Sequence, residues 1–230
     1  MLQTHLNKSH DQVIFSLEDV SVRYGDMFAL DCVNLNIFQG EILFITGASG
    51  AGKTTLLKLL AGSISPTKGR VLLPGNLSKN KNYFSVQVFQ DLRLVNSQTG
   101  EQNLFQAFDR KVYDSKNSFI SEMKELCKAF GILDRIHLKI IDANGGLKQK
   151  IAMVRALLSR PDCLIADEPT CSLDYENNRK VFDILSLYNL KKGLTVIWSS
   201  HNKELVRKFS GRIIHLDNGK LVYTGHACFI

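Results

Sequence analysis

The segment Gly47–Thr54 constrains the fold of this 230-residue chain more than any other feature. It reads Gly-Ala-Ser-Gly-Ala-Gly-Lys-Thr and fits the phosphate-loop pattern G-x-x-x-x-G-K-S/T. An apolar run, Ile42–Ile45, precedes it like a strand buried on both faces, and a helix-like run follows. The loop N–H groups would hold a β-phosphate, Lys53 would bridge the β- and γ-phosphates, and Thr54 would offer its hydroxyl to Mg²⁺.

A second apolar run, Cys163–Ala166, ends in the two carboxylates Asp167 and Glu168. Ligands bind at the carboxyl ends of strands in open α/β sheets. Asp167 is predicted to orient the Mg²⁺ shell through water, and Glu168 to polarise a water for attack on the γ-phosphate. Such a run is a weak signal alone, and the phosphate loop upstream makes it a strong one.

Strand-like and helix-like runs alternate in the second half of the chain, which predicts a parallel sheet with crossover helices. Strands are expected over 163–166, 194–198 and 212–216, and helices over 146–160, 176–190 and 202–209. A hairpin turn at residues 217–219 is expected before a last strand over 220–223.

The first half of the chain is predicted to contain a strand-rich region followed by a helical one. Near the N-terminus we expect strands over 13–24, with a turn near Glu18 and Asp19, and over 33–38, where alternation indicates one more buried face. Short strands are expected over 70–73 and 86–89. Strand signals then disappear from Asp91 to Ala143, where helices over 101–108 and 117–130 predict a helical insertion.

Composition and charge exclude several classes of protein. No stretch approaches the roughly 18 apolar residues of a membrane-spanning helix. The first twelve residues lack the apolar region of a secretory signal and are interpreted as a flexible leader. Five cysteines without a C-x-x-C pair argue against a disulfide framework and a zinc site, and favour a reduced, cytoplasmic chain. The net charge of +7 suits either an anionic neighbour or a solvated basic surface.

The order of these motifs resembles the nucleotide-binding domain of ABC ATPases, from about Val13 to Tyr223. The resemblance implies an ABC-type P-loop α/β fold with a mixed sheet core, an antiparallel β subdomain and an inserted helical subdomain. It implies one domain over residues 13–230. The core would comprise 13–90 and 146–230, and the helical insertion 91–145.

The resemblance also implies an ATPase with ATP and Mg²⁺ at named positions. Gln90 would approach the metal and the attacking water, and His201 would contact the γ-phosphate. Ser172 and Asp174 match the D-loop, a segment expected to communicate across a dimer. Tyr24 would stack on adenine. The nucleotide-binding loop would comprise Gly47, Ala48, Ser49, Gly50, Ala51, Gly52, Lys53, Thr54 and Thr55.

The family's signature, L-S-G-G followed by Gln or Glu, is altered here. Asn144 replaces the serine and Leu147 the acidic or amide residue, while Gly145 and Gly146 remain. In the family this segment binds the nucleotide of the other subunit of a homodimer or heterodimer. Asn144 can still cap the helix and donate from its amide, so ATP sandwiching and slow hydrolysis both stay open.

The segments around Gln90 and Thr99 are similar to the cell-division, lipoprotein-release and macrolide-export group, nearest the cell-division ATPase. This likeness implies a peripheral protein on the cytoplasmic face of the inner membrane, with a separate integral membrane subunit and no nucleic-acid partner. It favours mechanotransmission over solute transport. A regulatory ATP-binding module with weak hydrolysis, and a lipoprotein-release or export transporter, are the alternatives. The candidate docking residues are Leu92, Leu94, Val95, Leu104 and Phe105, for which packing within the helical lobe is the alternative.

Overall fold

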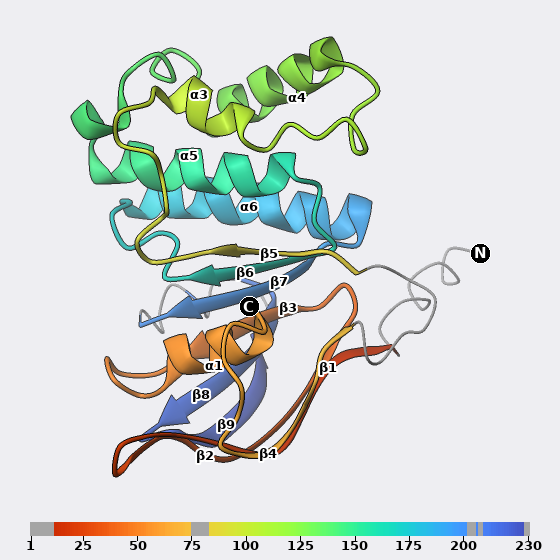
Figure 1. Ribbon diagram of the computed structural model, residues 1–230, viewed down its shortest axis with the longest axis vertical. Helices are drawn as coiled ribbons and strands as arrows, with labels where there is room; N and C mark the ends of the chain where they lie inside the picture. The colour runs from red at the N-terminus through yellow and green to blue at the C-terminus, as the bar shows by residue number, and fades with distance from the viewer. Residues whose placement is uncertain (1–11, 75–82, 202–205, 207–208, 228–230) are drawn as a thin grey trace.

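Two sheets and the helices packed on them form the described part of the chain in the computed structural model, residues 12–74, 83–201, 206 and 209–227 (Figure 1). The larger sheet has six strands in the order β5-β6-β7-β3-β8-β9, and the smaller has three in the order β2-β1-β4. The first five strands in this order, β5, β6, β7, β3 and β8, run parallel to one another, whereas β9 pairs antiparallel with β8. These sheets confirm the predicted α/β fold with a mixed core sheet and an antiparallel β unit.

Most elements lie close to their predicted positions, but the strand predicted over 33–38 begins six residues earlier, at Met27. The strands are β1 (Val13–Tyr24), β2 (Met27–Phe38), β3 (Ile42–Thr46), β4 (Lys68–Leu72), β5 (Ser85–Val88), β6 (Cys163–Asp167), β7 (Thr195–Ser200), β8 (Gly211–Asp217) and β9 (Lys220–Ala227). Within the residues described, the helices are α1 (Lys53–Leu60), α3 (Gly100–Phe105), α4 (Lys116–Ala129), α5 (Gly145–Leu158) and α6 (Tyr175–Lys192), and η1 (Ile140–Asp142) is a 3-10 turn.

Helices cover both faces of the six-stranded sheet (Figure 1). On one side lie α5 and α6, with α3 and α4 beyond them; on the other lies α1, followed by the antiparallel sheet. Side chains along β6 alternate between the two resulting cores: Leu164 and Ala166 join one cluster, whereas Cys163 and Ile165 join the other. This burial of both faces explains why the strand reads as a continuous apolar run.

The segment between β5 and α5 is helical, as predicted, and its helices begin at polar caps. Thr99 and Gln102 form a capping box at the start of α3, and Ser115 accepts a hydrogen bond at the start of α4. The Tyr113 hydroxyl donates to the carbonyl oxygen of Leu158 at 2.7 Å, which ties the segment to α5. The predicted division of the chain at residues 91 and 145 stays a prediction.

The predicted turn near Glu18 and Asp19 is wrong in one respect. The strand β1 runs through this point, and its register with β2 shifts between Leu17 and Val20, where Asp19 has a φ of 48°. A bulge therefore takes the place of the turn, because the extra residue is absorbed without breaking the strand.

Some predictions fall on residues that the structure does not describe: the leader, apart from Gln12, and most of the helix predicted over 202–209. Within the described residues, none of the helices combines the length and apolar character needed to cross a bilayer. Four of the five cysteines lie in the described part, and all four are free thiols: Cys32, Cys127, Cys163 and Cys171.

Candidate active site

The parallel strands bring the predicted site residues to one edge of the large sheet. In the register of β6 and β7, Asp167 lies opposite Ser199, and in that of β3 and β7, Thr46 lies opposite Ser200. The phosphate loop, Glu168 and His201 follow directly after these strand ends. Because the carboxyl ends of parallel strands meet at the same edge, segments more than 100 residues apart converge there.

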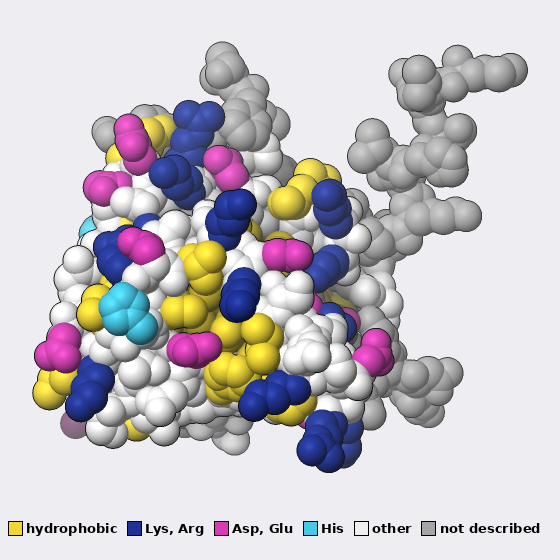
Figure 2. All heavy atoms as spheres, turned by 90° about the horizontal axis from the view of Figure 1, so that it is seen from above, with side chains coloured by type: hydrophobic (Ala, Val, Ile, Leu, Met, Phe, Trp, Pro, Cys, Tyr) yellow, Lys and Arg dark blue, Asp and Glu magenta, His cyan; other side chains and the backbone are white. Residues whose placement is uncertain are grey.

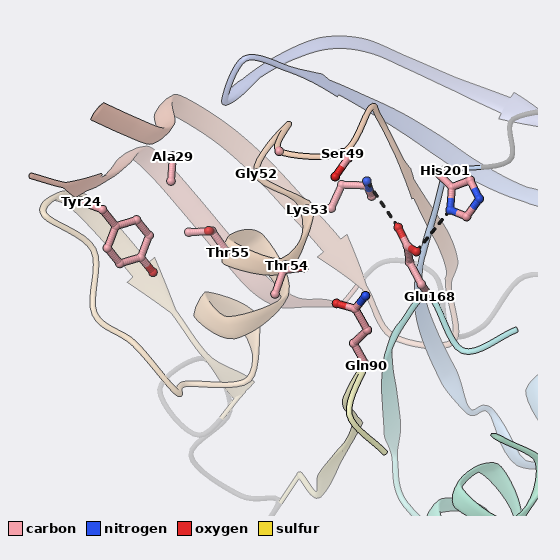
Figure 3. A pocket seen from close by; sticks show the side chains of 11 residues that line it. Tyr24, Ala29, Ser49, Gly52, Lys53, Thr54, Thr55, Gln90, Glu168 and His201 are labelled. Atoms are coloured by element: carbon pink, nitrogen blue, oxygen red, sulfur yellow. Dashed lines mark hydrogen bonds and ion pairs between the residues drawn. The ribbon is translucent and has the colours of Figure 1, made fainter. Parts of the chain in front are cut away.

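A pocket of about 460 Å³ opens at this edge (Figure 3). Tyr24 lies at one end of the pocket, and Glu168 and His201 lie at the other, with the phosphate loop between them. Tyr24 is 55% exposed, so its ring remains available for contact. The lining residues are Tyr24, Ala29, Ser49, Gly50, Gly52, Lys53, Thr54, Thr55, Gln90, Glu168 and His201.

Lys53 is held inside the phosphate loop. Its side chain is 6% exposed, and its ammonium donates to the carbonyl oxygens of Gly47 and Ala48, each at 3.0 Å. The same ammonium lies 3.6 Å from Oε1 of Glu168. A buried cation with acceptors on one side and a pocket on the other suits an anionic ligand such as a phosphate.

Two glycines of the loop cannot be replaced without displacing backbone. Gly47 has a φ of 157°, and a Cβ there would lie 2.5 Å from the carbonyl oxygen of Leu216. Gly52 has a φ of 103°, in the left-handed region, and a Cβ there would collide with the carbonyl oxygen of Ala29. The phosphate-loop pattern thus reflects steric needs of this particular site.

Hydroxyl groups on both sides anchor Asp167. Oδ2 accepts from the Thr54 hydroxyl at 2.8 Å, and Oδ1 accepts from the Ser199 hydroxyl at 2.6 Å. A hydroxyl, a carboxylate and the nearby Gln90 amide are hard oxygen donors of the kind that Mg²⁺ takes beside phosphate and water. The residues present therefore fit Mg²⁺.

Glu168 lies between the loop lysine and the histidine. Its Oε2 is 3.2 Å from Nδ1 of His201, and its backbone N–H donates to the Ser199 hydroxyl at 2.9 Å. Glu168 has a φ of 46°, which is uncommon outside glycine. Such strain clusters at functional sites, and here it directs the carboxylate toward the pocket (Figure 3).

A second pocket of about 510 Å³ forms at the start of α5, and is lined by residues predicted to form the altered signature and the D-loop. Asn144 caps α5 by accepting from the N–H of Leu147 at 2.9 Å. Beside it, Lys150 donates to Oδ1 of Asn177 at 2.6 Å, and burial lowers the pKa of this lysine. The lining residues are Arg135, Asn144, Gly145, Gly146, Leu147, Lys150, Ser172, Leu173, Asp174 and Asn177.

The predicted docking surface needs one correction. Leu104 is fully buried, because α3 turns this side chain into the core shared with α5, so it cannot take part in docking. Leu92, Leu94 and Phe105 are half-buried against that core, and Val95 is exposed. Figure 2 looks onto the end of the molecule that carries α3 and α4, where apolar side chains gather among Lys, Arg and acidic groups.

Three residues at these two sites, Ser199, Lys150 and Asn177, were given no individual role from the sequence. Ser199 joins Asp167 to the backbone of Glu168, and Lys150 joins α5 to α6 through Asn177. The sequence could have pointed to Ser199, since it is a polar residue at the end of an apolar strand. No sequence pattern points to Lys150 and Asn177, because they come together only when α5 and α6 pack.

The fold and the phosphate loop define a P-loop nucleotide-binding protein, and comparison with known proteins specifies the family. The sequence model described as ABC transporter matches residues 30–171. The chain is 36% identical to the phosphonates import ATP-binding protein PhnC 2 of Cupriavidus metallidurans, over 94% of this chain and 83% of that protein. The chain therefore belongs to the ABC transporter family.

Other relatives agree with this assignment. The chain is 33% identical, over 92% of its length, to the methionine import ATP-binding protein MetN of Rhizobium johnstonii, and spans 60% of that protein's length. It is 27% identical to the bacterial ABC transporter cassette MJ0796, whose structure is dimeric, with a TM-score of 0.80 over 94% of this chain and all of that one. The import relatives give no support to the predicted kinship with the cell-division ATPase.

Proposed function

We propose that the chain is the ATP-binding and ATP-hydrolysing subunit of a membrane transport complex. One observation carries the proposal: Lys53, Gln90, Glu168 and His201, from four separate segments, line a single pocket beside the phosphate loop. Catalysis of phosphoryl transfer needs positioned cations, a metal shell and a group that orients the nucleophile, and these four side chains can provide those functions.

In the proposed reaction, Lys53 exchanges its contact with Glu168 for the β- and γ-phosphates. Tyr24 stacks on the base at the other end of the pocket. Thr54, Gln90 and, through water, Asp167 would hold Mg²⁺, which would supply positive charge against the phosphates. Glu168 then accepts the proton of the attacking water, as the new P–O bond forms and the bond from the γ-phosphorus to the bridging oxygen breaks. His201 supports the transferring phosphate.

The second pocket is proposed to bind the nucleotide held by another copy or by a related subunit. The start of α5 presents N–H groups and the free Nδ2 of Asn144, and Arg135 and Lys150 add positive charge. In this arrangement the site of one chain is completed by Asn144, Gly145, Gly146, Ser172 and Asp174 of the other. The dimeric MJ0796 cassette supports such an assembly.

We propose solute uptake, at the cytoplasmic face of the inner membrane, as the role of the complex. The names of the relatives, import of methionine and of phosphonates, favour uptake over cell-division mechanotransmission and over export. A separate integral membrane subunit would dock at the surface around Leu92, Leu94 and Val95. Uptake supersedes the cell-division role that the sequence resemblance favoured.

A regulatory module with little turnover is the second candidate function. The substitutions Asn144 and Leu147 in the signature favour it, because this segment acts on the partner's nucleotide. In that case ATP binding would dimerise the chain and recruit partners without rapid hydrolysis.

The test of the proposed function is recovery of partners by a tagged Glu168→Gln chain from detergent-solubilised native membranes with MgATP. A partner with many membrane spans is expected and supports uptake. A partner with few spans and a large extracytoplasmic domain would favour mechanotransmission instead. Recovery of soluble proteins alone, or of nothing, would contradict the membrane role. The Lys53→Ala chain is the control, because its recovery of partners should not depend on ATP.

A further inference from the structure

Arg155 of α5 holds the segment that follows β5 by two hydrogen bonds to the main chain. Its Nη2 donates to the carbonyl oxygen of Leu92 and its Nη1 to that of Arg93, each at 2.9 Å. Nη1 also lies 3.3 Å from Oε1 of Gln106, just after α3. One guanidinium therefore joins three segments: α5, the residues after β5, and the end of α3.

The two residues that Arg155 holds have unfavourable backbone conformations. Leu92 has a φ of 58° and Arg93 a φ of 44°. L-residues rarely adopt this left-handed region, because Cβ comes too close to the following carbonyl oxygen. Two such residues in succession, neither of them glycine, persist only where contacts from outside the segment favour them.

Local contacts complete the turn. The N–H of Leu92 donates to the carbonyl oxygen of Phe89 at 2.9 Å, and that of Arg93 donates to Asp91 at 2.7 Å. The Arg93 guanidinium lies 3.2 Å from the centroid of the Phe89 ring. Burial lowers the pKa of Arg155, whose charge is partly withdrawn from water and therefore needs the acceptors that the turn supplies.

The turn connects two surfaces that the proposed function uses. Gln90 lies between Phe89 and Asp91 and lines the nucleotide pocket. On the other side, Leu92, Leu94 and Val95 belong to the proposed docking surface. A change in the backbone at Leu92 and Arg93 therefore moves Gln90, two residues away.

We propose that Arg155 is a positioning residue that holds this strained turn and thereby keeps Gln90 at the nucleotide pocket. The inference rests on the proposed function for what Gln90 does, and on the geometry alone for the turn. When the bonds from Arg155 are lost, Leu92 and Arg93 relax toward ordinary backbone and Gln90 leaves the pocket.

The test replaces Arg155 by lysine, which keeps the charge but has no planar fork to bond both carbonyls. Two readouts are taken on the full chain: amide hydrogen exchange over residues 89–95, and the Mg²⁺ dependence of single-turnover ATP hydrolysis. We expect Arg155→Lys to speed exchange in this segment about tenfold relative to β3, and to raise the half-maximal Mg²⁺ concentration.

A rescue variant separates release of a strained turn from general loss of packing. Leu92→Gly in the Arg155→Lys background should restore slow exchange and the Mg²⁺ response in part, because glycine adopts a positive φ at little cost. Leu92→Ala is the matched control: it also removes the side chain but keeps Cβ, so it should not rescue. Equal rescue by both, or wild-type exchange in Arg155→Lys, would overturn the proposal.

The two proposals fail separately. If the wild-type chain hydrolyses no ATP, the proposed function fails and Gln90 loses its role, while the exchange experiment still decides whether Arg155 holds the turn. If ATP is hydrolysed but the Mg²⁺ dependence of Arg155→Lys matches wild type, Arg155 does not position Gln90 and the inference is wrong.

Discussion

The Lys53 ammonium lies 3.6 Å from Oε1 of Glu168, while Oε2 of the same carboxylate lies 3.2 Å from Nδ1 of His201. Glu168 is thus shared between the phosphate loop and the residue that follows β7. In the proposed function, a γ-phosphate near Lys53 would compete with Glu168 for the ammonium, and this competition would release the carboxylate to act on water. Binding and hydrolysis are therefore expected to respond differently to changes at these two residues.

Lys53→Ala should weaken ATP binding by about a hundredfold or more, because it removes a 6% exposed cation from the phosphate end of the pocket. Equilibrium titration with a fluorescent ATP analogue measures the affinity. Lys58→Ala is the matched control, since Lys58 lies exposed on the same helix, α1, and away from the pocket lining. Wild-type affinity in Lys53→Ala would refute the phosphate-loop assignment.

Glu168→Gln should bind ATP as tightly as wild type yet hydrolyse it at least about a hundredfold more slowly. Glutamine keeps the size of the side chain and one oxygen that can accept a hydrogen bond from His201, but it cannot act as a base toward water. Single-turnover hydrolysis with pre-bound ATP gives the rate without the binding step. Glu176→Gln, on the exposed first turn of α6, controls for loss of one acidic charge. Equal rates would remove Glu168 from the proposed chemistry.

The sequence predicts which residues gather at the candidate site when each of them directly follows an apolar strand. The phosphate loop, the Asp167–Glu168 pair and His201 each follow an apolar strand, and a parallel sheet brings such positions together without any knowledge of side-chain packing. The features that the sequence does not predict depend on contacts between residues that are far apart in the chain. The burial of Leu104 follows from how α3 packs on α5, and the bulge at Asp19 from the pairing of β1 with β2. The strained turn held by Arg155 depends on residues more than 60 positions apart.

Asn144→Ser should raise ATP turnover if the altered signature slows the enzyme. Serine also caps helices, so α5 should keep the hydrogen bond that Asn144 now accepts from Leu147. It also restores the hydroxyl of the family signature. Steady-state hydrolysis at saturating ATP, at chain concentrations that allow dimerisation, is the measurement.

Asn144→Ala distinguishes the two functions of this residue. It removes the cap and should cost about 1 kcal/mol of stability, whereas Asn144→Ser should leave the unfolding temperature close to wild type. If serine leaves turnover unchanged, asparagine is a neutral replacement, and the regulatory-module alternative loses its main support.

Asp174 should contribute stability that is lost in acid. It caps α6 and accepts from the backbone N–H of Asn177 at 2.8 Å and from its side-chain amide at 2.9 Å. The backbone hydrogen bond, and then the side-chain one, hold the pKa of Asp174 below its usual value of 3.8. The folded state therefore keeps this carboxylate charged at a pH where the unfolded chain protonates it. Its contribution is fully present above the unfolded pKa and disappears as the pH falls through the folded pKa.

Asp174→Asn isolates this contribution, because asparagine caps helices about as well but does not titrate in this range. Urea unfolding of both chains across a series of acidic pH values gives the difference in unfolding free energy. Wild type should have the advantage at neutral pH, and that advantage should shrink toward zero below the folded pKa. A difference that stays constant with pH would show that the charge on Asp174 does not stabilise the cap, and that its hydrogen bonds to Asn177 act as neutral ones do.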